Sequence, residues 1–149
     1  MTATASSTVP DSLQDLDNTF LPIGQMRQIT RVTHLAGPAI EGEVELGADH
    51  WVFAQHFPGD PIFPGTMIIE AAGQLVALWA WADGQRCRPR LVRTGAEFHA
   101  PSGPGESHLT LRATVKRKRH LHFATIEVWA GSVRVATVEA VLAVLAEHV

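Results

Sequence analysis

One run of apolar residues near the middle of the chain constrains the fold most. Residues 66–82 contain one Glu and one Gln, and apart from Thr66 the other side chains are apolar or absent. Pro64 precedes the run and Asp83-Gly84 follows it, which are typical start and stop signals of a helix. The run is short for a membrane span, and an acidic residue within it would be costly in lipid. We therefore expect a helix that is buried on nearly every side.

The remaining sequence predicts strands, which are the only material available to cover this helix. Before it, we expect strands over residues 26–33 and 40–46, separated by a Gly-Pro turn. After it, period-two alternation predicts about four strands, the first over residues 90–98, with a tight hairpin at Gly131-Ser132. These elements predict an α+β fold in which an antiparallel sheet curls around one central helix. An open sheet edge would favour pairing with a second copy.

Length and charge narrow the function classes. The 149 residues fit one domain, and the net charge of −3 argues against general binding of nucleic acid. The lone Cys87 cannot form an internal disulfide, which favours a reducing cytoplasm. Residues 1–18 are polar and lack a secretory signal pattern, so we expect a flexible tail there and a single domain over residues 19–149. No membrane association is expected.

The residues with chemical potential gather around the start of the helix. Glu70 and Gln74 lie one turn apart on one helix face, so the Gln74 amide could donate to the carboxylate. Gly65 lies in the first turn, where unpaired N–H groups favour an oxygen that gathers negative charge. His56 precedes three prolines, whose fixed φ angles stiffen its loop. These are a base, an oxyanion donor and an acid, although a structural loop histidine and a structural Glu–Gln pair would give the same residues.

The spacing of these residues resembles a known signature. The pattern H-F-P-G-D-P-x-x-P-G followed by I-I-E-A-x-x-Q covers residues 56–74. It is similar to the 3-hydroxyacyl-acyl-carrier-protein dehydratases of bacterial fatty-acid synthesis, which have the hot-dog fold. Weaker similarity extends over residues 21–145 and includes A-E-F-H-A-P-S-G-P-G-E at residues 96–106. The resemblance implies the hot-dog fold for this chain.

The resemblance also implies a role for each matched residue. His56 corresponds to the catalytic histidine and Glu70 to its acidic partner. Gly65 corresponds to the glycine whose N–H binds the thioester oxygen, and Gln74 to the residue that orients the acid. Glutamate, rather than aspartate, is typical of family members that dehydrate without isomerising the double bond. The His56–Phe57 peptide bond is expected to be cis, as it often is in the family.

The implied reaction converts a 3-hydroxyacyl thioester into a trans-2-enoyl thioester and water, with no cofactor and no metal. The implied partner is an acyl carrier protein that bears the substrate on phosphopantetheine. In the family the histidine and the acid of one site come from different subunits. We therefore expect a homodimer or an assembly of dimers, with a heterodimer as another possibility. The setting could be fatty-acid synthesis or a polyketide or polyene pathway.

The chain departs from the family pattern at two places. Gln55 replaces the usual glycine before the histidine, where it could contact the substrate. His99-Ala100 replaces a basic pair that docks the carrier. Positive charge lies instead between the helix and the next strand, which could contact an acidic carrier or could be a solvated edge. These residues are Arg86, Arg88, Arg90 and Arg93.

Other functions and sites remain open from the sequence. A thioesterase on the same fold would release free thiol, and a binding or scaffold subunit would need another hot-dog chain for activity. The basic run at residues 116–119 could bind a polyanion, but guarding a strand edge is the simpler interpretation. His120 and His122 could share a strand face, but no third ligand is evident, so no metal site is predicted.

Overall fold

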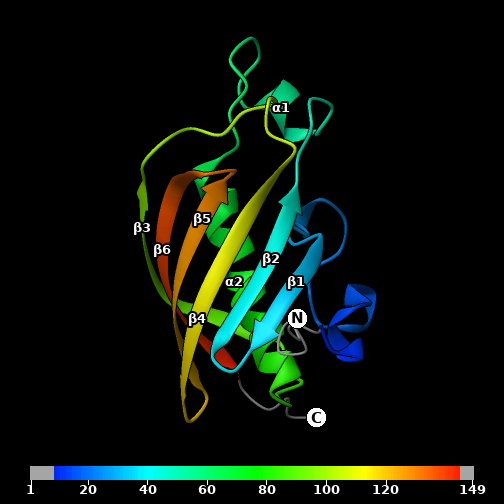
Figure 1. Ribbon diagram of the computed structural model, residues 1–149, viewed down its shortest axis with the longest axis vertical. Coiled ribbons are helices and arrows are strands. Elements are labelled where there is room, and N and C mark those ends of the chain that lie inside the picture. The colour runs from blue at the N-terminus through cyan, green and yellow to red at the C-terminus, as the bar shows by residue number, and fades with distance from the viewer. Residues whose placement is uncertain (1–8, 145–149) are drawn as a thin grey trace, which may run out of the picture.

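The structure is a computed structural model that describes residues 9–144 (Figure 1). One long helix lies against one face of a six-stranded sheet, and a short helix precedes it. The main elements, in chain order, are β1 (Arg31–Ala36), β2 (Ala39–Glu45), α1 (Val52–Gln55), α2 (Gly65–Ala82), β3 (Pro89–Phe98), β4 (His108–Lys118), β5 (Leu121–Ala130) and β6 (Val133–Val144).

The sheet has the strand order β1-β2-β4-β5-β6-β3, and every neighbouring pair is antiparallel. Figure 1 shows it curling around α2, which crosses behind the strands. This confirms the predicted α+β arrangement of one sheet wrapped around one helix. Within the described residues, β1 and β3 form the two edges of the sheet.

The ends of α2 follow from their local sequence. Pro64 is the N-cap residue, and its fixed φ angle suits the entry into a helix. At the other end, Gly84 has a φ angle of 94°, which glycine adopts without a steric penalty. Gly84 N–H donates to the carbonyl of Trp81, and Gln85 N–H donates to that of Ala80. These two hydrogen bonds form a Schellman motif, which ends the helix where the sequence predicts.

The core lies between α2 and the concave face of the sheet. Along β4 the side chains alternate between buried and more exposed positions, so one face of the strand packs on the helix. Gly42 of β2 allows the sheet to approach closely, because a Cβ there would lie 2.9 Å from Leu75 Cδ1 of α2. The largest fully buried side chains include Ile29, Ile40, Leu75, Leu78, Leu109, Leu111 and Ile126.

Three local features differ from the sequence prediction. Residues Gly24–Met26 form a 3₁₀ turn, and the first strand begins only at Arg31. The expectation of a flexible tail over residues 1–18 is corrected for the described part of that segment, because residues 11–18 contain two 3₁₀ turns. Leu13 and Leu16 are only 1% and 7% exposed there, so burial of these leucines in the core explains the order. The short helix α1 was not predicted.

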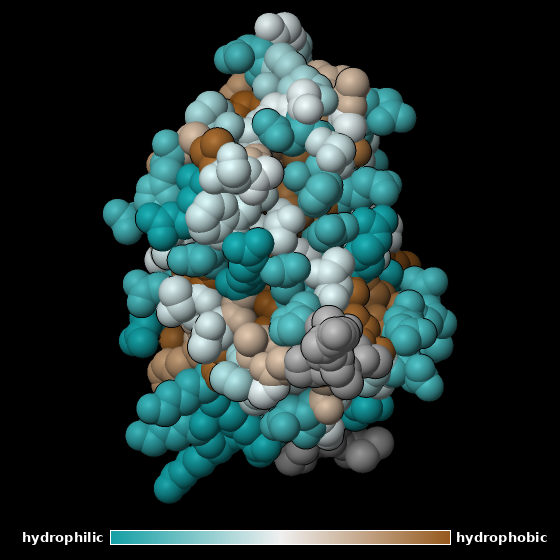
Figure 2. All heavy atoms as spheres, viewed as in Figure 1, coloured by the Kyte–Doolittle hydropathy of each residue, from teal (hydrophilic) through white to brown (hydrophobic). Residues whose placement is uncertain are grey.

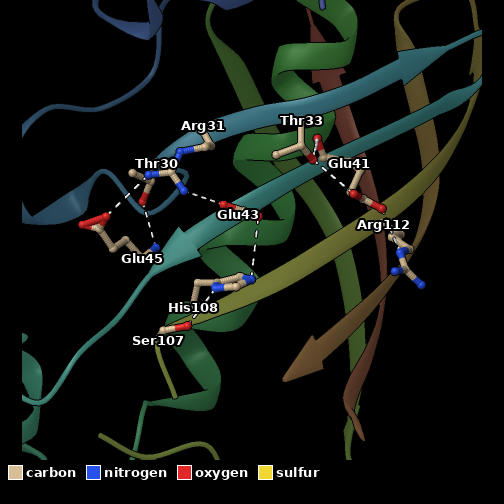
Figure 3. A network of polar contacts seen from close by, with 9 residues as sticks. All are labelled: Thr30, Arg31, Thr33, Glu41, Glu43, Glu45, Ser107, His108 and Arg112. Atoms are coloured by element: carbon tan, nitrogen blue, oxygen red, sulfur yellow. Dashed lines mark hydrogen bonds and ion pairs between the residues drawn. The ribbon is translucent and has the colours of Figure 1, made fainter. Parts of the chain in front are cut away.

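The convex face of the sheet is polar over β1, β2 and β4. Carboxylates at alternate positions of β2 point to this face and meet basic side chains from the flanking strands (Figure 3). Arg112 Nε lies 2.8 Å from Glu41 Oε1, and Arg31 pairs with both Glu43 and Glu45. In Figure 2 hydrophilic side chains cover much of this face, which therefore offers charge rather than a broad apolar surface.

The hairpin between β4 and β5 extends past the lower end of the helix (Figure 1). Its basic run, residues 116–119, lies past Thr114, the last residue of β4 that pairs with β2, so among the described residues the outer edge of β4 has no partner strand there. This agrees with the prediction that the run guards a strand edge. His120 lies in the turn, whereas His122 is completely buried, so the two do not share an accessible strand face. Among residues 9–144, no helix combines the length and the hydropathy needed to span a membrane.

Candidate active site

The acidic half of the predicted site is built on one face of α2. Gln74 Nε2 donates a hydrogen bond of 2.9 Å to Glu70 Oε2, as the spacing of the two residues predicts. Gln74 is 3% exposed, and Glu70 is partly buried. A buried amide that donates to the carboxylate fixes the orientation of the carboxyl group relative to the helix.

Gln74 is itself fixed by the segment that precedes β1. Its Nε2 also donates to the Met26 carbonyl at 2.7 Å. Its Oε1 accepts from the N–H groups of Gln28 and Ile29, at 2.8 and 3.2 Å. All of the strong donors and acceptors of the amide are therefore engaged, which is the expected state of a buried polar group. The same side chain ties the segment to the helix and holds the acid.

Glu70 and Gln74 line a cavity of about 510 Å³. The helix contributes a row of residues at helical spacing, and small side chains leave open space along its middle. The cavity walls are mostly apolar, which suits an acyl group beside one polar reaction centre. The lining residues from α2 are Thr66, Ile69, Glu70, Gly73, Gln74 and Ala77, and the others include Phe20, Leu21, Leu91 and Leu142.

The basic half of the site is a closed loop that follows α1. His56 is the C-cap residue of α1, and its N–H donates to the Val52 carbonyl at 2.8 Å. The loop is closed by a backbone hydrogen bond of 2.8 Å from Ile62 N–H to the His56 carbonyl, and by two more between Phe57 and Asp60. The His56–Phe57 peptide bond is cis, as the resemblance implies. Backbone hydrogen bonds, together with the prolines, hold the loop in one shape.

The hydrogen bond of the His56 ring determines which nitrogen can act as a base. His56 Nδ1 lies 3.0 Å from the Ile62 carbonyl oxygen. A carbonyl only accepts, so Nδ1 carries the proton in the neutral ring and Nε2 carries the lone pair. The Phe57 ring stacks on the imidazole at a centroid distance of 4.0 Å. The arrangement therefore defines the tautomer of the ring in its neutral form.

A second histidine supports α1. The Val52 N–H donates to His50 Nδ1 at 3.2 Å, so the neutral His50 ring carries its proton on Nε2. The ring packs near Phe53 and Phe63, at centroid distances of 5.8 and 5.9 Å. Burial lowers the pKa of His50, and the nearby Asp49 opposes this only in part. His50 therefore holds the start of α1 as a neutral hydrogen-bond acceptor.

Gly65 lies where α2 begins, and its N–H has no partner within the helix. The Phe98 ring packs against this glycine, and a Cβ at position 65 would lie 2.8 Å from Phe98 Cζ. The space that the missing side chain leaves is thus occupied by an aromatic ring. Glycine is needed here for close packing, and the N–H remains at the positive end of the helix dipole.

The two halves of the site are not assembled around one cavity within a single chain. Neither His56 nor Gln55 lines the cavity that holds Glu70, as far as residues 9–144 define it. Gln55 is exposed and His56 is partly buried. Thus one chain joins Glu70 to Gln74, and holds His56 separately in its own loop.

The four arginines predicted for carrier docking have different surroundings. Arg88 and Arg90 line the cavity that contains Glu70. Arg86 stacks on the Trp81 ring at 4.4 Å from its centroid and donates to the Trp81 carbonyl. Arg93 lies on the other side of the sheet edge, in a groove of about 520 Å³. They are therefore not one patch.

Sequence reasoning did not find several residues that shape the site. The carbonyls of Met26 and Ile62 leave no sequence signal, because any residue supplies a carbonyl. Phe98 on Gly65 is a long-range contact and is equally invisible. Thr66 could have been found, because it lies one turn before Glu70 on the same helix face.

The sheet wrapped around one helix defines this chain as a hot-dog fold. The model of the FabA-like domain matches residues 21–139, so the chain belongs to the FabA-like domain family.

Solved structures with the same fold have different activities. The dehydratase heterocomplex ApeI:P from Xenorhabdus doucetiae is 15% identical, with a TM-score of 0.74 over 89% of this chain and 91% of that chain. The thioesterase HI1161 from Haemophilus influenzae is 19% identical, with a TM-score of 0.59 over 79% and 80%. The TT0310 protein from Thermus thermophilus is 21% identical, with a TM-score of 0.60 over 77% and 91%. At these identities the likeness supports the fold alone.

Proposed function

We propose that the chain is a dehydratase that removes water from 3-hydroxyacyl thioesters. The observation that carries the proposal is the pairing of two prepared groups. One is a histidine whose Nε2 lone pair is set by the hydrogen bond from Nδ1 to Ile62. The other is a carboxyl group that Gln74 orients toward an acyl-sized cavity. Removal of water from a 3-hydroxyacyl group needs one base and one acid of this kind.

In the proposed reaction, His56 Nε2 takes the proton from Cα, and the electron pair of that bond moves toward the thioester carbonyl. The Gly65 N–H at the start of α2 stabilises the negative charge that develops on the carbonyl oxygen. This electron pair then returns from the carbonyl side to form the Cα–Cβ double bond as the Cβ–O bond breaks. Glu70 gives its proton to the departing hydroxyl, which leaves as water. His56 loses its proton and Glu70 regains one through solvent, which resets the site.

The proposed site needs two copies of the chain. The edge strand β3 exposes apolar side chains, including Leu91 at 54%, Val92 at 58% and Phe98 at 50%. Phe57, which stacks on the His56 ring, is 51% exposed. A second copy that pairs along β3 would cover these side chains and could bring its histidine loop to the cavity of the first. The proposed assembly is therefore a homodimer, and a heterodimer would satisfy the same geometry.

The proposed carrier of the substrate is an acidic acyl carrier protein with a phosphopantetheine arm. Arg86 and Arg93 lie outside the cavity. Arg86 precedes β3 and stacks on Trp81, and Arg93 lies within β3 and lines the separate groove. Basic side chains there would attract an acidic protein toward the cavity without taking part in the chemistry.

A thioesterase is the second candidate function, because the same fold is found in the H. influenzae thioesterase. Hydrolysis would require Glu70 or His56 to activate water at the thioester carbonyl. Dehydration is favoured here, because both an acid and a separate base are prepared.

The test is incubation of the pure protein with a 3-hydroxyacyl thioester on carrier protein and, separately, on coenzyme A. Mass spectrometry should show the loss of one water, and this loss should disappear in His56→Ala. Release of free thiol without loss of water would instead establish a thioesterase. A folded dimer that changes neither substrate would contradict the proposal for the chain alone and would point to a missing partner subunit.

A further inference from the structure

Thr66 is a polar side chain of the cavity to which the proposed reaction gives no role. It lies in the first turn of α2 and lines the cavity together with Glu70. One helix face therefore carries a hydroxyl, a carboxyl and an amide in a row, at Thr66, Glu70 and Gln74. A hydrogen bond joins the amide to the carboxyl. The hydroxyl is the third polar group of this row.

The Thr66 hydroxyl is not used to hold the fold together. A threonine inside a helix often bonds the carbonyl one turn earlier. For Thr66 that residue is Ile62, which lies outside the helix because α2 begins at Gly65, and the Ile62 carbonyl interacts with His56 Nδ1. Within residues 9–144 the Thr66 hydroxyl makes no hydrogen bond, and the residue is exposed. Its donor and its acceptor sites are therefore open to a ligand in the cavity.

The Glu70 carboxyl group has one engaged oxygen and one open oxygen. Oε2 accepts from Gln74 Nε2 at 2.9 Å, whereas Oε1 has no hydrogen-bond partner among the described residues. When the acid is protonated, its carbonyl oxygen is the better acceptor, so Oε2 takes that role and the proton lies on Oε1. Oε1 is therefore the atom from which the proton leaves in the proposed reaction.

The spacing of Thr66 and Glu70 fits one oxygen atom between their polar groups. The Cβ atoms of residues four apart on a helix lie about 5–6 Å from each other. Two O–H···O hydrogen bonds in series span a similar distance, since each is about 2.7 Å long. Helical side chains also lean toward the N-terminus, so Glu70 leans over the turn that contains Thr66. A substrate hydroxyl at Oε1 would thus lie within reach of Thr66.

We propose that the Thr66 hydroxyl binds the 3-hydroxyl group of the substrate and holds it against Glu70, an inference that rests on the proposed dehydration. The 3-hydroxyl oxygen accepts the proton of Glu70 Oε1 and donates its own hydrogen to Thr66 Oγ1. These two contacts direct a lone pair of the leaving oxygen at the acid. When the Cβ–O bond breaks, they hold the water that forms. Thr66 itself exchanges no proton, so its role is to position the substrate.

The thioester oxygen is another atom that a hydroxyl next to Gly65 could bind. The Gly65 N–H points out of the end of the helix, where the proposed reaction places this oxygen. Thr66 instead lies on the helix face that carries Glu70, so the 3-hydroxyl is the better match. Ligands with and without a 3-hydroxyl both keep the carbonyl oxygen and therefore separate the two contacts.

The binding experiment compares the 3-hydroxyoctanoyl and octanoyl amides of N-acetylethylenediamine, in which nitrogen replaces the thioester sulfur. An amide resists both hydrolysis and dehydration, so both ligands stay intact. Isothermal titration calorimetry should show that the wild-type protein binds the hydroxylated ligand more tightly. Thr66→Val replaces the hydroxyl with a methyl group and should reduce this preference about 3- to 10-fold, because one hydrogen bond between neutral groups contributes that much. Thr66→Ser should keep the preference.

Thr125→Val is the matched control, because it makes the same chemical change at an exposed position of β5, outside the cavity. It should leave the preference unchanged. An equal loss of affinity for both amides in Thr66→Val would mean that Thr66 acts on the carbonyl oxygen or on the shape of the cavity, which would overturn the inference. A wild-type protein that shows no preference for the hydroxylated amide would overturn it as well.

The kinetic experiment follows loss of water from the 3-hydroxyoctanoyl thioester of N-acetylcysteamine by mass spectrometry. Thr66→Val should lower kcat/KM about 10-fold, Thr66→Ser should recover most of it, and Thr125→Val should match the wild-type protein. An unchanged kcat/KM in Thr66→Val would contradict the inference. A protein that shows the Thr66-dependent preference but dehydrates no substrate would keep the hydroxyl contact and lose the proposed function. Dehydration without that preference would do the reverse.

Discussion

The acidic and the basic half of the candidate site are built in opposite ways. Glu70 is held by Gln74, which is 3% exposed. Gln74 also makes hydrogen bonds to the backbone of the segment that precedes β1. His56 lies instead in a loop beside an aromatic ring, Phe57, that is half exposed. The acid is therefore complete within the fold of one chain, whereas the histidine loop is rigid but uncovered. Under the proposed function, a second copy of the chain would complete the site at the loop.

The most demanding test of this difference uses two inactive variants. His56→Ala and Glu70→Gln should each lower dehydration by about 10²–10⁴-fold, because each removes a general acid or base. If each site combines the loop of one subunit with the helix of the other, mixed dimers contain one intact site. Mixing the two variants under conditions that exchange subunits should then restore about a quarter of wild-type activity, as random pairing of two chains gives.

The control for this experiment is each variant mixed with itself. Activity that does not rise on mixing, although native mass spectrometry shows mixed dimers, would mean that both groups act within one chain. The difference in burial between the two halves would then affect how each half folds, and would say nothing about a second subunit.

Gln74 should matter for stability far more than an exposed glutamine does. In Gln74→Leu the N–H groups of Gln28 and Ile29 and the carbonyl of Met26 lose their buried partner. We expect the free energy of unfolding to fall by about 2–4 kcal/mol, since each buried unpaired group costs about 1–3 kcal/mol. Chemical denaturation measures this change. Gln25→Leu makes the same chemical change at an exposed position and should stay within about 0.5 kcal/mol of wild type; equal losses in both would contradict the role of Gln74.

Much of the fold could be predicted from the sequence, because its signals are local. The helix over Gly65–Ala82 follows from Pro64, an apolar run and Gly84, and the hairpin at Gly131 follows from its turn residues. The alternation of apolar and polar residues predicts the bounds of the strands after α2 to within a few residues. The 3₁₀ turns over residues 11–18 could not be predicted, because only the burial of two leucines against the core orders a polar segment.

The site shows the same division between local and distant signals. Glu70 and Gln74 are four residues apart, so helix geometry alone predicts their contact. The partner of His56 is a backbone carbonyl, and the Phe98 ring reaches Gly65 of α2 from the end of β3. Such contacts depend on the tertiary fold and have no pattern in the sequence. The division of the four arginines between cavity and surface is equally a property of the folded chain.

The contact between Gly65 and Phe98 tests how tightly the start of α2 is packed. Gly65→Ala adds a methyl group 2.8 Å from the Phe98 ring, so the ring must move. Phe98 is 50% exposed and can turn, so we expect a loss of stability below about 1 kcal/mol. Dehydration should fall by a larger factor, about tenfold, if the ring then covers the N–H of residue 65. Addition of Phe98→Leu should restore part of the activity, and a double variant as slow as Gly65→Ala would reject this explanation.

His56 and His122 differ in burial and in hydrogen bonding. His56 is partly buried and one of its ring nitrogens is hydrogen-bonded, whereas His122 is fully buried and neither of its ring nitrogens has a hydrogen-bond partner within residues 9–144. The His122 ring on β5 lies in a T-shaped contact with the Trp79 ring on α2, at a centroid distance of 5.8 Å. Burial lowers the pKa of His122, and the Arg117 charge from β4 lowers it further. Asp83 at the end of α2 and the His120 backbone favour the charged form but only oppose this shift in part.

The lowered pKa of His122 gives a pH dependence with a definite sign. Below an ordinary histidine pKa of about 6.5 the unfolded chain binds a proton that the folded chain resists, so the free energy of unfolding falls as the pH drops. It is restored above that pH, where both states are neutral. His122→Phe should flatten the dependence, leaving the smaller slope that the lowered pKa of His50 causes. Thermal unfolding between about pH 5 and pH 7.5 measures this, with His120→Phe in the exposed turn as the control. If that control flattens the curve as much as His122→Phe does, burial of His122 is not the cause of the slope.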